Sequence, residues 1–157
     1  MRVLVTILLT GAALFAADSA DEKGAVAAVQ KLFDAMAAHD SEAARAVVIP
    51  EGRLYSTRSD GKPVGMTLEE FAARLSTRKE PMLERMWNPT VLVRGRIAQV
   101  WAEYDFHLSG KFHHCGIDSV SLVKGDDGWK IAGIVYTSET SGCRASPLGP
   151  PASLPAQ

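Results

Sequence analysis

The fold of this chain is decided by one stretch of sequence, GRIAQVWAEYDFHLSGKFHHCGIDSVSLV, which spans residues 95–123. Two runs within it, 97–108 and 112–123, show the alternating pattern of β-strands. The segment between them, Ser109-Gly110-Lys111, is a turn signal. The stretch therefore predicts two long antiparallel strands joined by a three-residue loop, with Leu108 opposite Phe112. A two-residue loop would set apolar positions against polar ones and is disfavoured, although a β-bulge would shift part of the pairing.

This register assigns every side chain of the two strands to one of two faces of the sheet. The first face carries the pairs Ala98/Leu122, Val100/Val120, Ala102/Asp118, Tyr104/Gly116 and Phe106/His114. The second face carries Trp101/Ser119, Glu103/Ile117, Asp105/Cys115 and His107/His113. Because the first face is apolar at one end, we expect it to lie under helices, and we call it the inner face.

Helices are expected mainly on the N-terminal side of these strands. Apolar residues at helical spacing predict helices over 25–38 and 41–46, and a third begins at a capping box formed by Thr67 and Glu70. Strands are expected at 54–58, 83–87, 90–93, 97–108, 112–123 and 129–137. Helices first and antiparallel strands afterwards indicate an α+β fold, in which helices cover one face of a curved sheet.

Several of these residues also suggest a family. The stretch GRIAQVWAEYDF (95–106) resembles the long central strand of nuclear-transport-factor-2-like proteins, and GWKI (128–131) resembles the start of their last strand. Within that superfamily, which includes SnoaL-like proteins, HCGID (114–118) with the late Gly142-Cys143 is similar to the group called putative lumazine-binding proteins. The resemblance covers about residues 24–143. It implies a cone-shaped domain, with N-terminal helices packed on a strongly curved, mostly antiparallel sheet around a pocket.

The two ends of the chain are expected to lie outside this domain, which we place at residues 21–143. Residues 1–20 begin with Arg2 after Met1, continue with an uncharged run and end with small residues, which is the order of a secretory signal peptide. We therefore expect an exported protein, periplasmic or secreted, cleaved between Ala16 and Ala20. Residues 144–157 are rich in proline and are expected to form a disordered tail.

Charge and cysteine content narrow the possible partners. The chain has 17 Lys and Arg residues against 18 Asp and Glu residues and no basic run, so it lacks the electrostatic footprint of a nucleic-acid-binding protein. We expect no membrane association after the signal is cleaved. Its two cysteines, Cys115 and Cys143, are expected to form a disulfide in an oxidising compartment. Two unpaired thiols are the alternative.

The polar residues of the inner face form the candidate site. Tyr104, His114 and Asp118 gather at one end of an otherwise apolar surface, which is the usual form of a small-molecule site. Asp118 could act as a base or acid, and Tyr104 could donate to a developing oxyanion. His114 is expected to titrate near neutrality and could shuttle a proton. The alternative is that these groups only satisfy one another inside the sheet.

Four other residues are expected near the ligand, a small and largely apolar or aromatic molecule. Phe106 and Trp129 share the inner face, and Arg85 and Trp87 are placed at the mouth of the pocket. A solvated arginine and a packed tryptophan are the alternative interpretations of the last two. No cofactor is expected.

The outer face raises two further possibilities. Asp105, His107 and His113 are close enough on it to suggest a metal, but they lack the spacing of zinc sites, and we expect none. Trp101 and Ile117 on this face favour a homodimer. Three functions therefore compete: an exported binding protein, an acid/base enzyme of the isomerase, dehydratase or cyclase type, and a non-catalytic dimerisation or assembly module.

Overall fold

The computed structural model describes residues 12–58 and 61–151, and it confirms the α+β class. Within these residues, the first half of the chain contains the three helices and the first two strands, and the second half contains the four remaining strands. The elements are α1 (Ala12–Ala38), α2 (Ser41–Arg45), β1 (Val48–Arg58), β2 (Pro63–Thr67), α3 (Leu68–Leu75), β3 (Met82–Arg94), β4 (Ile97–Leu108), β5 (Lys111–Gly125) and β6 (Gly128–Ser138).

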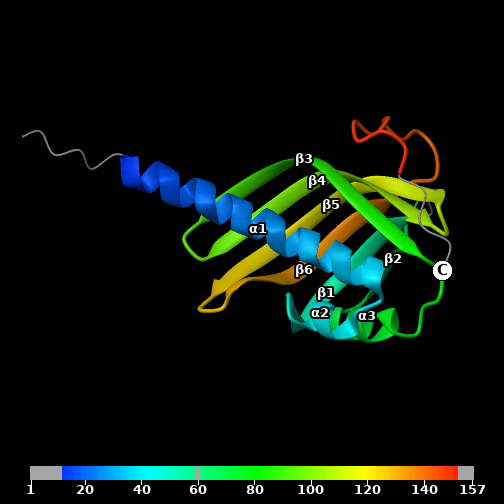
Figure 1. The fold of residues 1–157 in the computed structure, drawn as a ribbon, viewed down its shortest axis with the longest axis horizontal. Helices are drawn as coiled ribbons and strands as arrows, with labels where there is room; N and C mark the ends of the chain where they lie inside the picture. Colours follow the sequence, from blue (N-terminus) through cyan, green and yellow to red (C-terminus); the bar gives the residue numbers. More distant parts are fainter. Residues whose placement is uncertain (1–11, 59–60, 152–157) are drawn as a thin grey trace, which may run out of the picture.

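The strands form one six-stranded sheet in the order β2-β1-β6-β5-β4-β3. All neighbours are antiparallel except β1 and β6, which are parallel. Figure 1 shows α1 lying across the sheet, with α2 and α3 grouped beside β1 and β2. The helices thus cover one face of the sheet, as expected.

The register of β4 and β5 confirms eight of the nine pairs that the sequence predicts, from Ala98/Leu122 to Phe106/His114. The predicted pairing next to the turn is wrong. His107 pairs with Phe112, and the loop has two residues, Ser109 and Gly110, with φ of 52° and 74°. Two consecutive positive φ angles are typical of the type I′ turn that matches strand twist. A bulge absorbs the one-residue offset and leaves His113 unpaired in the ladder.

Four other elements differ from expectation in their bounds. The strand expected at 54–58 begins six residues earlier, since β1 spans Val48–Arg58. The first helix begins at Ala12 instead of near Ala25. The segment Pro63–Thr67, which the sequence pattern divides between a turn and a helix cap, is a short strand paired with β1. The strands expected at 83–87 and 90–93 form one strand, β3, whose register shifts between Trp87 and Thr90, where Asn88 has a φ of 47°.

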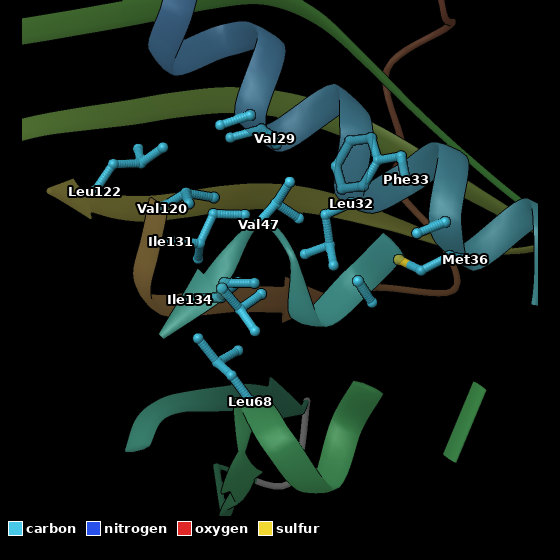
Figure 2. Packing of buried hydrophobic residues seen from close by; sticks show 14 of the residues in the cluster. Val29, Leu32, Phe33, Met36, Val47, Leu68, Val120, Leu122, Ile131 and Ile134 are labelled. Atoms are coloured by element: carbon cyan, nitrogen blue, oxygen red, sulfur yellow. The ribbon is translucent and has the colours of Figure 1, made fainter. Parts of the chain in front are cut away.

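The apolar end of the inner face forms a closed core with α1. Figure 2 shows Val29 and Leu32 of α1 directed toward Val120, Ile131 and Ile134 of the sheet. Leu32, Val120 and Ile131 are each almost fully buried. The apolar side of the helix is buried against the sheet, and this burial holds the helices on it.

The capping box that starts α3 is present, as the sequence predicts. Glu70 N donates to Thr67 Oγ1, and Thr67 N donates to Glu70 Oε2. These two bonds satisfy backbone donors that a helix start leaves without partners inside the helix, so they fix where α3 begins.

Cys115 and Cys143 form a disulfide, which confirms the pairing and excludes two unpaired thiols. After β6, the segment 139–151 has no helix or regular strand, but it returns to the outer face of the sheet. Glu139 bridges Cys115, Arg144 pairs with Glu103 at 2.9 Å, and the Arg85 guanidinium donates to the Gly149 carbonyl. This segment therefore lies against β3, β4 and β5.

The start of the chain lies partly outside the described residues. Residues 1–11 of the expected signal peptide belong to that part, so the signal peptide stays a prediction. Within the described residues, α1 is attached to the sheet by an ion pair between Asp21 and Lys124. Across the ranges 12–58 and 61–151, no helix combines the length and the hydropathy needed to cross a bilayer.

Candidate functional site

A cavity of about 340 Å³ lies between α1, α3 and the inner face of the sheet, beyond the closed core. Most of the residues that line it are apolar, among them Leu32, Phe33, Met36, Phe71, Val120 and Ile134. Its volume is near the lower end of the range of roughly 300–1,000 Å³ that is usual for small-molecule sites. The cone predicted from the sequence therefore encloses space.

A pair of carboxyl groups, Glu84 and Asp118, lies in the wall of this cavity. Glu84 comes from β3 and Asp118 from β5, with β4 between them, and the two side chains share a hydrogen bond. Asp118 is only 4% exposed. Glu84 keeps part of its surface open to the cavity, although it lies deep in the protein. Two acids in contact inside an apolar cavity cannot both ionise easily.

Burial raises the pKa of both acids. It raises the pKa of Asp118 from 3.8 to about 7. The pKa of Glu84 is raised well above its usual range, by burial first and then by the charge of Asp118. The hydrogen bond between them raises the pKa of Glu84 and lowers that of Asp118, so Glu84 is the protonated donor and Asp118 the acceptor. Near neutral pH the pair can therefore take up or release a proton.

The two acids differ in how much of their surface reaches the cavity. Asp118 is almost fully buried, its Oδ2 is closed off from the cavity, and the Glu84 carboxyl is its donor. Glu84 keeps more of its surface open. A bound molecule with an O–H or N–H group would therefore meet the open part of this pair.

Sequence reasoning placed Asp118 correctly on the inner face but missed Glu84. Its position follows from the pairing of β3 with β4, in which Glu84 lies opposite Phe106. Alternation alone leaves that register open, because the shift at Asn88 and Pro89 obscures it. A usable signal was present, however: Glu84 is a lone acid between Met82 and Met86 on one face of an apolar strand.

His114 lines the cavity beside a second histidine. Its ring packs against Phe106 and Tyr104, with centroids 5.0 Å and 5.6 Å away, and its Nδ1 is 2.8 Å from Nδ1 of His113. Burial, and then the neighbouring His113, lower the pKa of His114 to about 4. The sequence-based expectation of titration near neutrality is therefore wrong. His114 is an uncharged hydrogen-bonding group at neutral pH.

Tyr104 is on the inner face but does not line the cavity. It is almost fully buried, and its hydroxyl donates to the Thr137 carbonyl oxygen at 2.7 Å. Burial, and then the charge of Asp118, raise its pKa further above the usual range. The hydroxyl that was expected to contact a ligand therefore already has a backbone partner.

Arg85, Trp87 and Trp129 are likewise absent from the cavity wall. Arg85 points to the outer face, where its Nε and Nη2 donate to Asp105 at 2.8 Å and 2.5 Å, and Trp87 pairs with Glu103 of that face. Trp129 is buried at the far end of the sheet; a Cβ added to Gly24 of α1 would lie 2.9 Å from its ring. Phe106 does line the cavity.

The three outer-face residues considered for a metal are divided between the two sides of the sheet. Asp105 and His107 remain together, with Oδ2 and Nε2 3.4 Å apart, whereas the bulge turns His113 into the cavity wall. In the part of the chain that the structure describes, no three His, Cys, Asp or Glu side chains are placed to hold a metal ion.

The cavity opens between two exposed side chains. Of the described residues that line it, only Arg78 and His113 are exposed. Arg78 belongs to the loop that connects α3 to β3. The acids Glu84 and Asp118 lie inward of this opening, so the site has a basic mouth and an acidic interior.

Comparison with known proteins gives the chain its family. Residues 20–137 match the family model described as "Putative lumazine-binding". No match to a curated protein was found.

Similar solved structures share the fold at low sequence identity. An NTF2-like protein with a cystatin-like fold from Novosphingobium aromaticivorans is 15% identical, with a TM-score of 0.68 over 88% of this chain and 94% of that one. An NTF2-like protein of unknown function from Shewanella baltica is 16% identical, with a TM-score of 0.61 over 78% of this chain and 97% of that one. A protein described as a putative dehydratase from the NTF2-like family of Streptomyces avermitilis is 14% identical, with a TM-score of 0.63 over 79% and 99% of the two chains.

The match spans most of the chain, and the fold agrees with that of NTF2-like proteins. The chain therefore belongs to the putative lumazine-binding family.

Proposed function

We propose that this protein binds a small molecule in the cavity, with a polar group of that molecule against Glu84 and Asp118. The observation that supports this most is the pair of carboxyl groups in the wall of an apolar cavity. A buried negative charge is costly unless a cation or hydrogen-bond donor compensates it, and among the described residues no cation lies against this pair. A polar group of a bound ligand would supply such a partner.

The wall defines the chemistry of the ligand. Its apolar residues favour a largely apolar or aromatic body, and the Glu84–Asp118 pair favours an O–H or N–H donor on it. Lumazine, which the family is named after, is a planar heterocycle with ring N–H groups, so it is the first compound to test.

The test is co-purification. Protein exported by its host should carry a small molecule that mass spectrometry detects after denaturation, and Ser56→Phe should remove it, since Ser56 is buried in the cavity wall. Ser121→Phe, a matched change at an exposed position of β5, should keep it. Retention of the same molecule by Ser56→Phe would refute binding in the cavity.

An acid/base enzyme is the second candidate. The supporting observation is the pKa of about 7 for Asp118, since a catalytic base works best with a pKa near the operating pH. Asp118 would remove a proton and the protonated Glu84 would return one, with neutral His114 as a hydrogen-bonding group. A binding protein releases the co-purified molecule unchanged. An enzyme converts it, and Asp118→Asn should stop the conversion.

Export and self-association complete the proposal. A disulfide is typical of oxidising compartments, and it supports a periplasmic or secreted protein, which N-terminal sequencing of the mature chain would test. On the outer face, Trp101 is 52% exposed, whereas Ile117, the other residue of the predicted interface, is half-buried. Ile97, which is 60% exposed, and Val135 are exposed on this face as well. Such a patch supports a homodimer, and Trp101→Glu should then give a monomer in sedimentation velocity.

A further inference from the structure

A positively charged side chain, Arg78, lies at the mouth of the cavity, and the proposed function does not yet use it. The Arg78 side chain lines the cavity and makes no ion pair or side-chain hydrogen bond with any described residue. Arg45 of the helical layer differs, because Glu42 and Glu69 hold it. Arg78 is thus an unpaired guanidinium at the entrance of an apolar cavity.

The buried part of the cavity wall has the opposite character. Glu84 and Asp118 line it, and the pair carries negative charge whenever Asp118 is ionised. A ligand anion placed beside the pair would face that charge and lose its hydration, which is unfavourable. The same anion at the mouth would meet Arg78 and remain partly hydrated.

We infer that the ligand is a small amphipathic anion, bound with its carboxylate or similar acidic group at Arg78, its apolar body in the cavity and a hydroxyl or N–H donor at the Glu84–Asp118 pair. This inference rests on the proposed binding function and adds the ligand class and its orientation. A guanidinium suits the acidic group because it offers two parallel N–H donors to one carboxylate.

His113 supports the same orientation. It is the other exposed residue of the mouth, and its Nδ1 is occupied with Nδ1 of His114 at 2.8 Å, which leaves Nε2 as a second polar atom beside the entrance. The polar groups of the cavity are therefore arranged along one direction, basic outside and acidic inside. A ligand with one acidic end and one neutral donor end fits in a single orientation.

The experiment uses a probe that carries both an acidic group and a hydroxyl group. The probe is 6-hydroxy-2-naphthoate, which has a carboxylate and a hydroxyl on opposite ends of an aromatic body, and its methyl ester lacks only the negative charge. Binding of both to the wild-type protein, to Arg78→Gln and to Lys79→Gln is measured by isothermal titration calorimetry. Lys79→Gln is the matched control, because it removes one positive charge from the adjacent exposed residue, which does not line the cavity.

The expected result is a charge effect confined to Arg78. The acid should bind the wild-type protein roughly three- to tenfold more tightly than the ester, because an exposed ion pair is worth little and a charge-assisted hydrogen bond somewhat more. Arg78→Gln should remove this preference and leave the ester unchanged. Lys79→Gln should keep the preference, and added salt should weaken binding of the acid alone.

Other outcomes separate the two proposals. Equal binding of acid and ester by the wild-type protein, unchanged in Arg78→Gln, would overturn the anionic ligand while binding in the cavity stands. Loss of the preference in both variants would assign it to general charge and also overturn the role of Arg78. If neither naphthalene binds the wild-type protein at all, the inferred ligand class is overturned, whereas the binding function is decided by the co-purification experiment.

Discussion

Two buried aspartates on neighbouring strands, Asp105 on β4 and Asp118 on β5, point to opposite faces of the sheet and have opposite surroundings. Asp105 is bound by both nitrogens of the Arg85 fork, at 2.8 Å and 2.5 Å. Asp118 faces another acid, Glu84, and no cation among the described residues lies against it.

The two are almost equally buried, at 6% and 4% exposure, so burial does not distinguish them. The two aspartates differ in whether a neighbouring positive charge compensates their own negative charge. The charge of Asp105 is paired inside the protein, and that of Asp118 is not. A compensated buried charge is typical of a structural role, and an uncompensated one beside a cavity is typical of a binding or catalytic role.

The largest effect should come from removing the positive charge that compensates Asp105. Arg85→Met leaves Asp105 buried without its cation, which should lower the free energy of unfolding by about 3–5 kcal/mol, as measured by urea denaturation. Arg96→Met is the control, because Arg96 and Asp126 form an ion pair at the surface, and it should change little. A loss below about 1 kcal/mol in Arg85→Met would show that the Arg85–Asp105 pair is not structural.

The uncompensated aspartate, Asp118, should make the stability of the protein depend on pH. Because burial raises the pKa of Asp118 from 3.8 to about 7, the folded protein holds a proton that the unfolded chain has lost between these values. The Asp118 contribution to stability should therefore fall as pH rises from about 4 to about 7, by on the order of 4 kcal/mol in total. Asp118→Asn should lack this fall.

The quantity to measure is the difference in unfolding free energy between wild type and Asp118→Asn across that pH window. Taking the difference cancels the acids whose pKa is lowered, such as Glu69, Glu70 and Asp127, since they oppose the trend in both proteins. A difference independent of pH would mean that the pKa of Asp118 is not raised.

The disulfide belongs to the structural side of the comparison, since Cys115 lies opposite Asp105 in the ladder. Replacing Cys115 and Cys143 together by serine should cost about 2–4 kcal/mol, because the bond restricts the unfolded chain. The affinity for 6-hydroxy-2-naphthoate should not change, because neither cysteine lines the cavity. A parallel loss of affinity would show that the outer face controls the site.

Tyr104→Phe should give the smallest effect. It removes the hydrogen bond to the Thr137 carbonyl oxygen and should cost about 1 kcal/mol of stability. Binding of the probe should remain as in the wild type, since the hydroxyl is engaged away from the cavity. If the variant keeps its stability but loses binding, Tyr104 belongs with Asp118 on the functional side.

The sequence predicted those parts of the site that depend on simple alternation. Asp118, His114 and Phe106 were placed on the inner face because β4 and β5 are regular up to Phe106. Alternation also put Trp129 on that face, but it cannot tell the closed end of a cone from the open one. The predicted ligand contact is therefore a packing residue at the far end.

What the sequence did not reveal follows from irregular backbone and from loops. The register shift between Trp87 and Thr90 hid the position of Glu84 and the outward direction of Arg85. Arg78 lies in a loop without periodicity, so only the folded chain shows that it reaches the cavity. Conformations such as the positive φ of Asn88 are set by tertiary packing and leave only a weak trace in composition.

The bulge at His113 has a consequence for how such a pocket can diversify. An extra residue in a hairpin reverses which face one side chain points to, while the ladder on the other side of it stays in register. Insertion or deletion of one residue between Lys111 and His114 would thus add or remove an imidazole at the cavity mouth without altering the strands that form the core. A length change in the β4–β5 hairpin would therefore alter the polar groups at the cavity mouth without a substitution elsewhere in the wall.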